Sequence, residues 1–96
     1  MAHISVDISE SDTGWTANVT VSESDSSSSH TVKVDKSYCR KLTSGDYTPE
    51  QLVETSFEFL LAREPKEAIL SQFELPVIAR YFPEYENKIG VLLAGN

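Results

Sequence analysis

Hydrophobic and polar positions alternate along the first third of the chain. The apolar side chains fall at every second residue in three runs, namely Ile4, Val6 and Ile8, then Trp15, Ala17, Val19 and Val21, then Val32 and Val34. A period of two buries one side of each run and predicts β-strands at about 3–9, 15–22 and 30–35. Gly14 suits the left-handed position of a short hairpin loop, so the first two strands are expected to form an antiparallel hairpin.

Residues 23–29, Glu-Ser-Asp-Ser-Ser-Ser-Ser, form the one low-complexity run. This run has no apolar side chain to bury, which predicts a flexible hairpin loop between the second and third strands. The pattern of residues 3–35 therefore predicts a three-stranded antiparallel sheet of β-β-β order.

From residue 36 the apolar spacing becomes that of helices. Tyr38 and Leu42 are four residues apart, Arg40 and Lys41 lie where a helix C-terminus favours cations, and Ser44-Gly45 ends the element. We expect a short helix of about two turns here.

The strongest local signals belong to a helix expected at about 49–63. Thr48 and Gln51 form a capping box around Pro49, which occupies the first helical position. The buried stripe is expected to consist of Val53, Phe57, Leu60 and Leu61, facing the sheet. Glu50, Glu54 and Glu58 recur every four residues and should face water, whereas Phe59 lies off the stripe and should meet a later helix.

Prolines divide the remainder of the chain into short helices, expected at 66–73, 77–82 and about 84–93. The fold class predicted is α+β: one domain over residues 1–96, with a sheet at about 3–35. The helical part, at about 36–93, should consist of a long helix and several short helices packed on one face of the sheet.

Composition and charge narrow the function classes. The chain has 96 residues, of which 40% are hydrophobic and 24% charged, as is ordinary for a soluble globular protein. The net charge of −7 opposes binding to nucleic acid or to an anionic membrane, because those partners are also negative. The N-terminus lacks the features of a signal peptide and no run is apolar enough to span a membrane, so we expect a cytoplasmic protein.

The sequence contains no recognisable enzyme signature. Its four glycines form no phosphate-binding loop, and neither His3 nor His30 has a second ligand at metal-binding spacing. Cys39 is the only cysteine, which excludes an internal disulfide and favours an inert, half-buried thiol. We therefore expect no enzyme activity, catalytic residue, cofactor or metal.

The run from about 32 to 86 resembles a group of short uncharacterised prokaryotic proteins. The shared sequence motifs lie in residues 57–70, Phe-Glu-Phe-Leu-Leu-Ala-Arg-Glu-Pro-Lys-Glu-Ala-Ile-Leu, and in 81–85, Tyr-Phe-Pro-Glu-Tyr. This resemblance implies a cytoplasmic, prokaryotic, single-domain protein, and it supplies no catalytic residue.

Two binding functions remain open. The first is an interaction or regulatory module that docks another protein or associates with itself, because the chain has more large aromatics than a helix layer over three strands needs. The residues predicted to contact such a partner are Phe59, Arg63, Lys66, Arg80 and Tyr85.

The second is a nucleic-acid-binding regulator. Residues 66–85 have roughly the proportions of a helix-turn-helix. However, residues 64–82 contain three acidic and two basic side chains, and only Arg80 lies on the expected recognition helix. Since phosphate contacts supply much of the affinity, the composition favours the protein partner.

Overall fold

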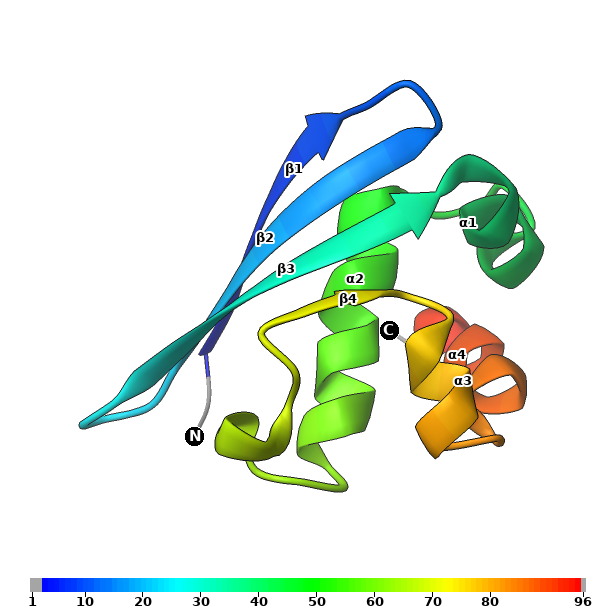
Figure 1. Ribbon diagram of the computed structural model, residues 1–96. Coiled ribbons are helices and arrows are strands. Elements are labelled where there is room, and N and C mark those ends of the chain that lie inside the picture. Colours follow the sequence, from blue (N-terminus) through cyan, green and yellow to red (C-terminus); the bar gives the residue numbers. More distant parts are fainter. Residues whose placement is uncertain (1–2, 96) are drawn as a thin grey trace.

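Four strands form one mixed sheet in the computed structural model, which describes residues 3–95 (Figure 1). β1 (His3–Glu10), β2 (Gly14–Ser22) and β3 (Ser27–Asp35) are antiparallel neighbours, and β4 (Gln72–Glu74) pairs in parallel with β3. The single α+β domain is therefore confirmed. The prediction of three antiparallel strands is wrong, because a segment expected to be helical returns to the sheet and adds a fourth strand.

Side chains of the sheet alternate between a buried and an exposed face, as the sequence predicts. On the helix side of the central strands the following side chains are buried: Ala17, Val19, Val21, His30, Val32 and Val34. Their neighbours on the opposite face, such as Asn18, Thr20 and Lys33, are exposed. One face of the sheet therefore carries the core, and the other faces solvent.

The Ser-rich loop is shorter than expected. Only Glu23–Ser26 form the turn, in which the Glu23 N–H donates to the Ser26 carbonyl over 2.8 Å. Ser27, Ser28 and Ser29 already belong to β3 and pair with β2. The prediction of a loop over 23–29 is wrong at this end, because strand pairing uses the backbone and does not require apolar side chains.

Two capped helices follow the antiparallel strands. α1 (Lys36–Thr43) begins at Asp35, whose carboxylate accepts from the Ser37 N–H over 3.0 Å, and ends at Ser44, which is left-handed at φ 55°. α2 (Pro49–Leu61) begins with the reciprocal bonds of the predicted capping box, at 2.8 and 3.1 Å. α2 has 13 residues and α4 (Tyr85–Ala94) has 10, so the expected single long helix is not evident.

α2 contacts the sheet on one side and α4 on another (Figure 1). It buries side chains toward both. Toward the sheet, the Phe57 ring lies 5.3 Å from His30 and 6.1 Å from Phe73, centroid to centroid. Toward α4, the Phe59 ring lies 5.3 Å from that of Tyr85. The predicted burial of Phe57 and the predicted contact of Phe59 with a later helix are both confirmed.

The helix predicted over residues 66–73 is wrong. A single 3₁₀ turn, η1 (Lys66–Ala68), is followed by extended backbone and β4. The Thr31 N–H donates to the Ser71 carbonyl over 2.7 Å and the Leu75 N–H to the Lys33 carbonyl over 2.9 Å. These bonds to β3 outweigh the helical preference of a short segment. The later short helices form near their expected positions, as α3 (Val77–Tyr81) and α4.

The short helices do not form one layer on the sheet. α4 packs against α1 and α2, and α3 packs against α4, so α4 rests mainly on other helices. The Tyr38 hydroxyl donates to Glu86 over 2.8 Å, which joins α1 to α4. This bond, helped by Lys41, lowers the pKa of the Glu86 carboxyl. The helices lie on one side of the sheet, as predicted, but they do not all pack directly on that face.

A buried hydroxyl pair joins α2 to α4. The Ser56 hydroxyl donates its single proton to the Leu52 carbonyl over 2.6 Å. Because that proton is already used, the Tyr85 hydroxyl must donate to Ser56 Oγ, 2.6 Å away. Burial raises the pKa of the Tyr85 phenol, so it remains protonated and able to donate at neutral pH.

We expect Phe57→Ala to lower the free energy of unfolding by about 3–5 kcal/mol, because it removes a fully buried aromatic. Glu54→Ala, on the exposed side of the same helix, should cost less than about 0.5 kcal/mol. Urea unfolding of the two variants measures the difference. Equal midpoints would show that the buried face of α2 is misassigned.

A double-mutant cycle tests the hydroxyl pair. Tyr85→Phe should cost about 1 kcal/mol, whereas Ser56→Ala should cost about 1–3 kcal/mol because it leaves a buried donor without an acceptor. The double variant should lose less than the sum of both, by about 0.5 kcal/mol or more. Additive losses in thermal or denaturant unfolding would contradict a bond between these hydroxyls.

Candidate functional site

An apolar groove lies where η1, β4 and α3 meet the end of α2. Its volume is about 420 Å³. The apolar side chains that line it include Leu60, Ile69, Leu70, Phe73, Val77 and Tyr81. Glu64 also lines the groove, and it has no ion pair among residues 3–95. The groove therefore combines an apolar surface with one uncompensated negative charge.

The rim of the groove exposes two large hydrophobic side chains. Leu70 is 46% exposed and Tyr81 is 67% exposed. The other large hydrophobics exposed in the described part of the chain, Val91 and Leu92, lie on α4. An aromatic and an aliphatic side chain exposed beside an apolar hollow are typical of a surface that contacts another molecule.

His30 fixes the wall that carries Leu70. Its Nδ1–H donates to the Leu70 carbonyl over 2.8 Å, and its Nε2 lies 2.8 Å from the Ser28 hydroxyl. With Nδ1 donating, Nε2 accepts from Ser28 in the neutral ring. The His30 ring is itself buried against Phe57.

Lys66 ties η1 to the turn between β2 and β3. Its side chain is 3% exposed, and Nζ lies 2.7 Å from Glu23 Oε1 and 2.5 Å from Glu67 Oε2. Bonds to Glu23 and Glu67 raise the pKa of the Lys66 ammonium, and Lys66 lowers the pKa of Glu67. The predicted role of Lys66 as an exposed partner contact is wrong, because both its stem and its charge are used within the molecule.

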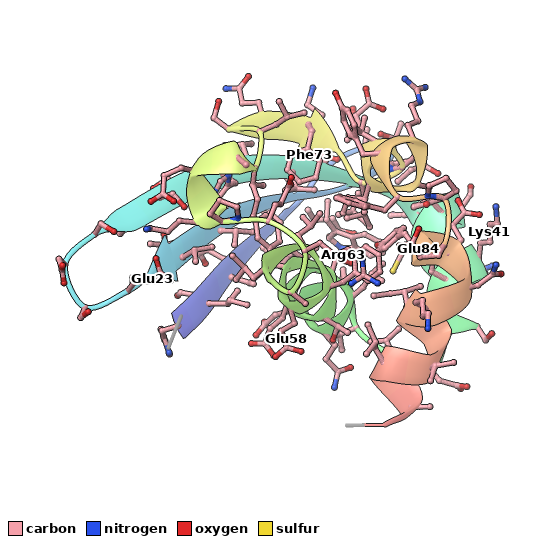
Figure 2. All side chains as sticks on the ribbon, turned by 90° about the horizontal axis from the view of Figure 1, so that it is seen from below. Glu23, Lys41, Glu58, Arg63, Phe73 and Glu84 are labelled. Carbon is pink, nitrogen blue, oxygen red and sulfur yellow. The ribbon has the colours of Figure 1, made fainter. Side chains whose placement is uncertain are left out.

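Arg63 is also engaged within the domain. Its guanidinium carbon lies 3.7 Å from the centroid of the Phe59 ring, and its Nε donates to Glu84 Oε2 over 3.3 Å. Figure 2 shows Arg63 and Glu84 side by side. The pKa of Glu84 is lowered by its own backbone N–H and, to a smaller extent, by Arg63. Arg63 therefore covers the core at the place where α2 meets α4.

The two aromatics predicted to contact a partner belong to the core. Phe59 is 2% exposed and Tyr85 is fully buried, so both predictions of an exposed contact are wrong. Arg80 is exposed on α3, but neither it nor the other four predicted contacts line the groove. The residues that line the groove are therefore different from the partner contacts that charge and aromaticity predicted.

The helix-turn-helix alternative lacks its first helix. Residues 66–73 contain one 3₁₀ turn and part of a strand, and α3 has only five residues. The geometry expected for residues 66–85 is therefore absent from this part of the chain. That correction removes the structural basis for a recognition helix carrying Arg80.

The groove residues were missed because their segment was assigned to a helix. Leu70 and Phe73, within the helix predicted over 66–73, both line the groove. Phe73-Glu74-Leu75 alternates apolar and polar side chains between the proline boundaries at 65 and 76, and this is the local signal of a strand. Three residues are too few to separate a period of two from a helical period.

Other candidate chemistry is confined to the core or not found. Cys39 is buried, and burial raises the pKa of its thiol, which disfavours the reactive thiolate. Residues 3–95 hold no cluster of three or more His, Cys, Asp or Glu side chains placed to bind a metal ion. Within the same range, no helix is long and apolar enough to cross a membrane.

We expect His30→Phe to lower the free energy of unfolding by about 1–3 kcal/mol, because it keeps a ring beside Phe57 and leaves the Leu70 carbonyl without its donor. His3→Phe on exposed β1 is the matched control and should change stability by less than about 0.5 kcal/mol. Denaturant unfolding measures both. A neutral His30→Phe would mean that the histidine does not hold the groove wall.

Comparisons of this chain with protein-family models, with curated proteins and with solved structures found no match. The similarity of residues 57–85 to short prokaryotic proteins therefore stays a prediction.

Proposed function

We propose that this domain is a protein-interaction module that binds a hydrophobic segment of another protein in the groove between η1, β4 and α3. The observation that carries the proposal is the apolar groove with Leu70 and Tyr81 exposed on its rim. Leaving large apolar side chains in water is unfavourable by about 25 cal/mol for each Å² that a partner could cover. A bound segment removes that cost.

The dimensions of the groove suit side chains rather than a flat protein face. A volume of about 420 Å³ lies at the lower end of the range for binding pockets and accommodates about two or three large apolar side chains. Glu64 adds a negative charge with no ion pair in the described residues. The segment that fits is therefore apolar, with a lysine or arginine next to its apolar residues.

Charge supports a protein partner over nucleic acid. The net charge is −7, and the cations near the groove are largely compensated, Lys66 by Glu23 and Glu67 and Arg63 by Glu84. Arg80 has no comparable pairing in residues 3–95. Lys33, which lies beside β4, likewise has no ion pair in the described residues. Two free cations supply little of the phosphate neutralisation on which nucleic-acid affinity depends.

The proposal predicts that peptides selected from a phage-displayed random library on the wild-type domain bind through the groove. Leu70→Asp should weaken their binding by at least about tenfold, because it places a charge on the apolar rim beside Glu64. Leu92→Asp is the matched control, since Leu92 is similarly exposed (38%) but lies on α4. Binding is measured by titration calorimetry after circular dichroism has shown both variants folded.

Failure to select any peptide would contradict the proposal. Equal losses of affinity in Leu70→Asp and Leu92→Asp would also contradict it, because the groove would then have no special role. Peptides rich in lysine or arginine beside apolar residues would agree with the charge of Glu64.

A further inference from the structure

β4 presents a free backbone edge at the groove. It is the last strand of the sheet, and its outer side has no strand partner among residues 3–95. The Ser71 carbonyl and the Leu75 N–H both bond to β3. Since backbone groups along a strand alternate in direction, those of Phe73 also face β3. The N–H and C=O groups of Gln72 and Glu74 therefore point outward.

Hollows lie on both faces of this edge. On the helix side is the apolar groove, to which β4 contributes Phe73. Toward the other face lies a second hollow of about 580 Å³, to which the polar residues Thr31, Lys33, Gln72 and Glu74 contribute. It shares the apolar residues Leu70, Phe73 and Val77 with the groove. Side chains of an added strand alternate between the two faces of a sheet, so one segment reaches both hollows.

We propose that the partner segment binds as an extended strand added to the outer edge of β4. Its backbone pairs with Gln72 and Glu74. Its apolar side chains, at positions i and i+2, enter the groove, and the polar side chain between them enters the second hollow. This inference rests on the proposed function and specifies the conformation and side-chain pattern of the segment. Strand addition of this kind draws affinity from the backbone and specificity from alternate pockets.

The surroundings of the edge favour a flexible segment of another protein over a second folded copy. β4 has only three residues, with η1 and α3 on either side of it (Figure 1). A second copy would present an equally short edge, and two copies would each carry a charge of −7. Glu64 selects a basic residue beside the apolar pair, and such a residue is attracted by the whole acidic domain.

The polar part of the second hollow suits an uncharged side chain. Lys33 and Glu74 are partners in the register of β3 and β4, and both are exposed. They carry opposite charges on the same face of the sheet, so the hollow has no net charge to select an ion. We therefore expect Ser, Thr, Asn or Gln between the two apolar positions of the segment.

The test uses a peptide selected on the full domain, with each backbone amide of the peptide N-methylated in turn. If the peptide adds to β4, methylation should weaken binding by about tenfold at alternate positions and little at the positions between. Amide hydrogen exchange provides a second readout. The Gln72 and Glu74 amides should become protected on binding, whereas the Phe73 amide, already paired with β3, should change little.

The outcomes separate this inference from the proposed function. One outcome is a peptide that binds the wild-type domain but not Leu70→Asp, with no alternating effect of N-methylation and no protection of the Gln72 and Glu74 amides. That outcome overturns strand addition and leaves groove binding in place. A domain that binds no peptide overturns both. A dimer that forms through β4 of two copies, detected by sedimentation together with the same protection, overturns the choice of a heterologous partner.

Discussion

The burial of α2 on two sides is the constraint on which this fold depends. Residues at most positions of the helix are covered, by the sheet around Phe57 and by α4 around Phe59. A polar residue on such a helix must find a partner inside the protein, and Ser56 does so by bonding both Leu52 and Tyr85. Glu50, Glu54 and Glu58 lie on the remaining side of the helix, which is exposed to water. Figure 2 shows Glu58 projecting away from Phe73.

The groove arises where the chain leaves α2 and returns to the sheet. A helix of 13 residues is about 20 Å long, and after Leu61 the chain must turn back before β4 can pair with β3. Two polar contacts hold this return in place, the Lys66 ammonium with Glu23 and the His30 imidazole with the Leu70 carbonyl. Because these contacts use the Lys66 ammonium and the Leu70 backbone carbonyl, the apolar side chains of the segment are left to line a hollow with Leu60.

Most cations close to the groove serve the domain itself. Arg63 covers the Phe59 ring and pairs with Glu84, while Lys66 is enclosed by two carboxylates. A cation in these positions stabilises the meeting of chain segments far apart in sequence, and it is then not available to a polyanion. The surface that remains for recognition is apolar and acidic, which is consistent with a basic, hydrophobic segment as the partner.

The sequence by itself determined the features that depend on neighbouring residues. Alternation located β1 to β3, the Thr48–Gln51 capping box located the start of α2, and Ser44-Gly45 located the end of α1. Only the tertiary structure decided the parallel pairing of β4, because Val32 and Phe73 are distant in the chain and three residues show no clear period. It also decided that Tyr85 and Lys66 are buried while Leu70 and Tyr81 are exposed. Burial depends on which segments meet in space, and no local pattern in residues 66–85 carries that information.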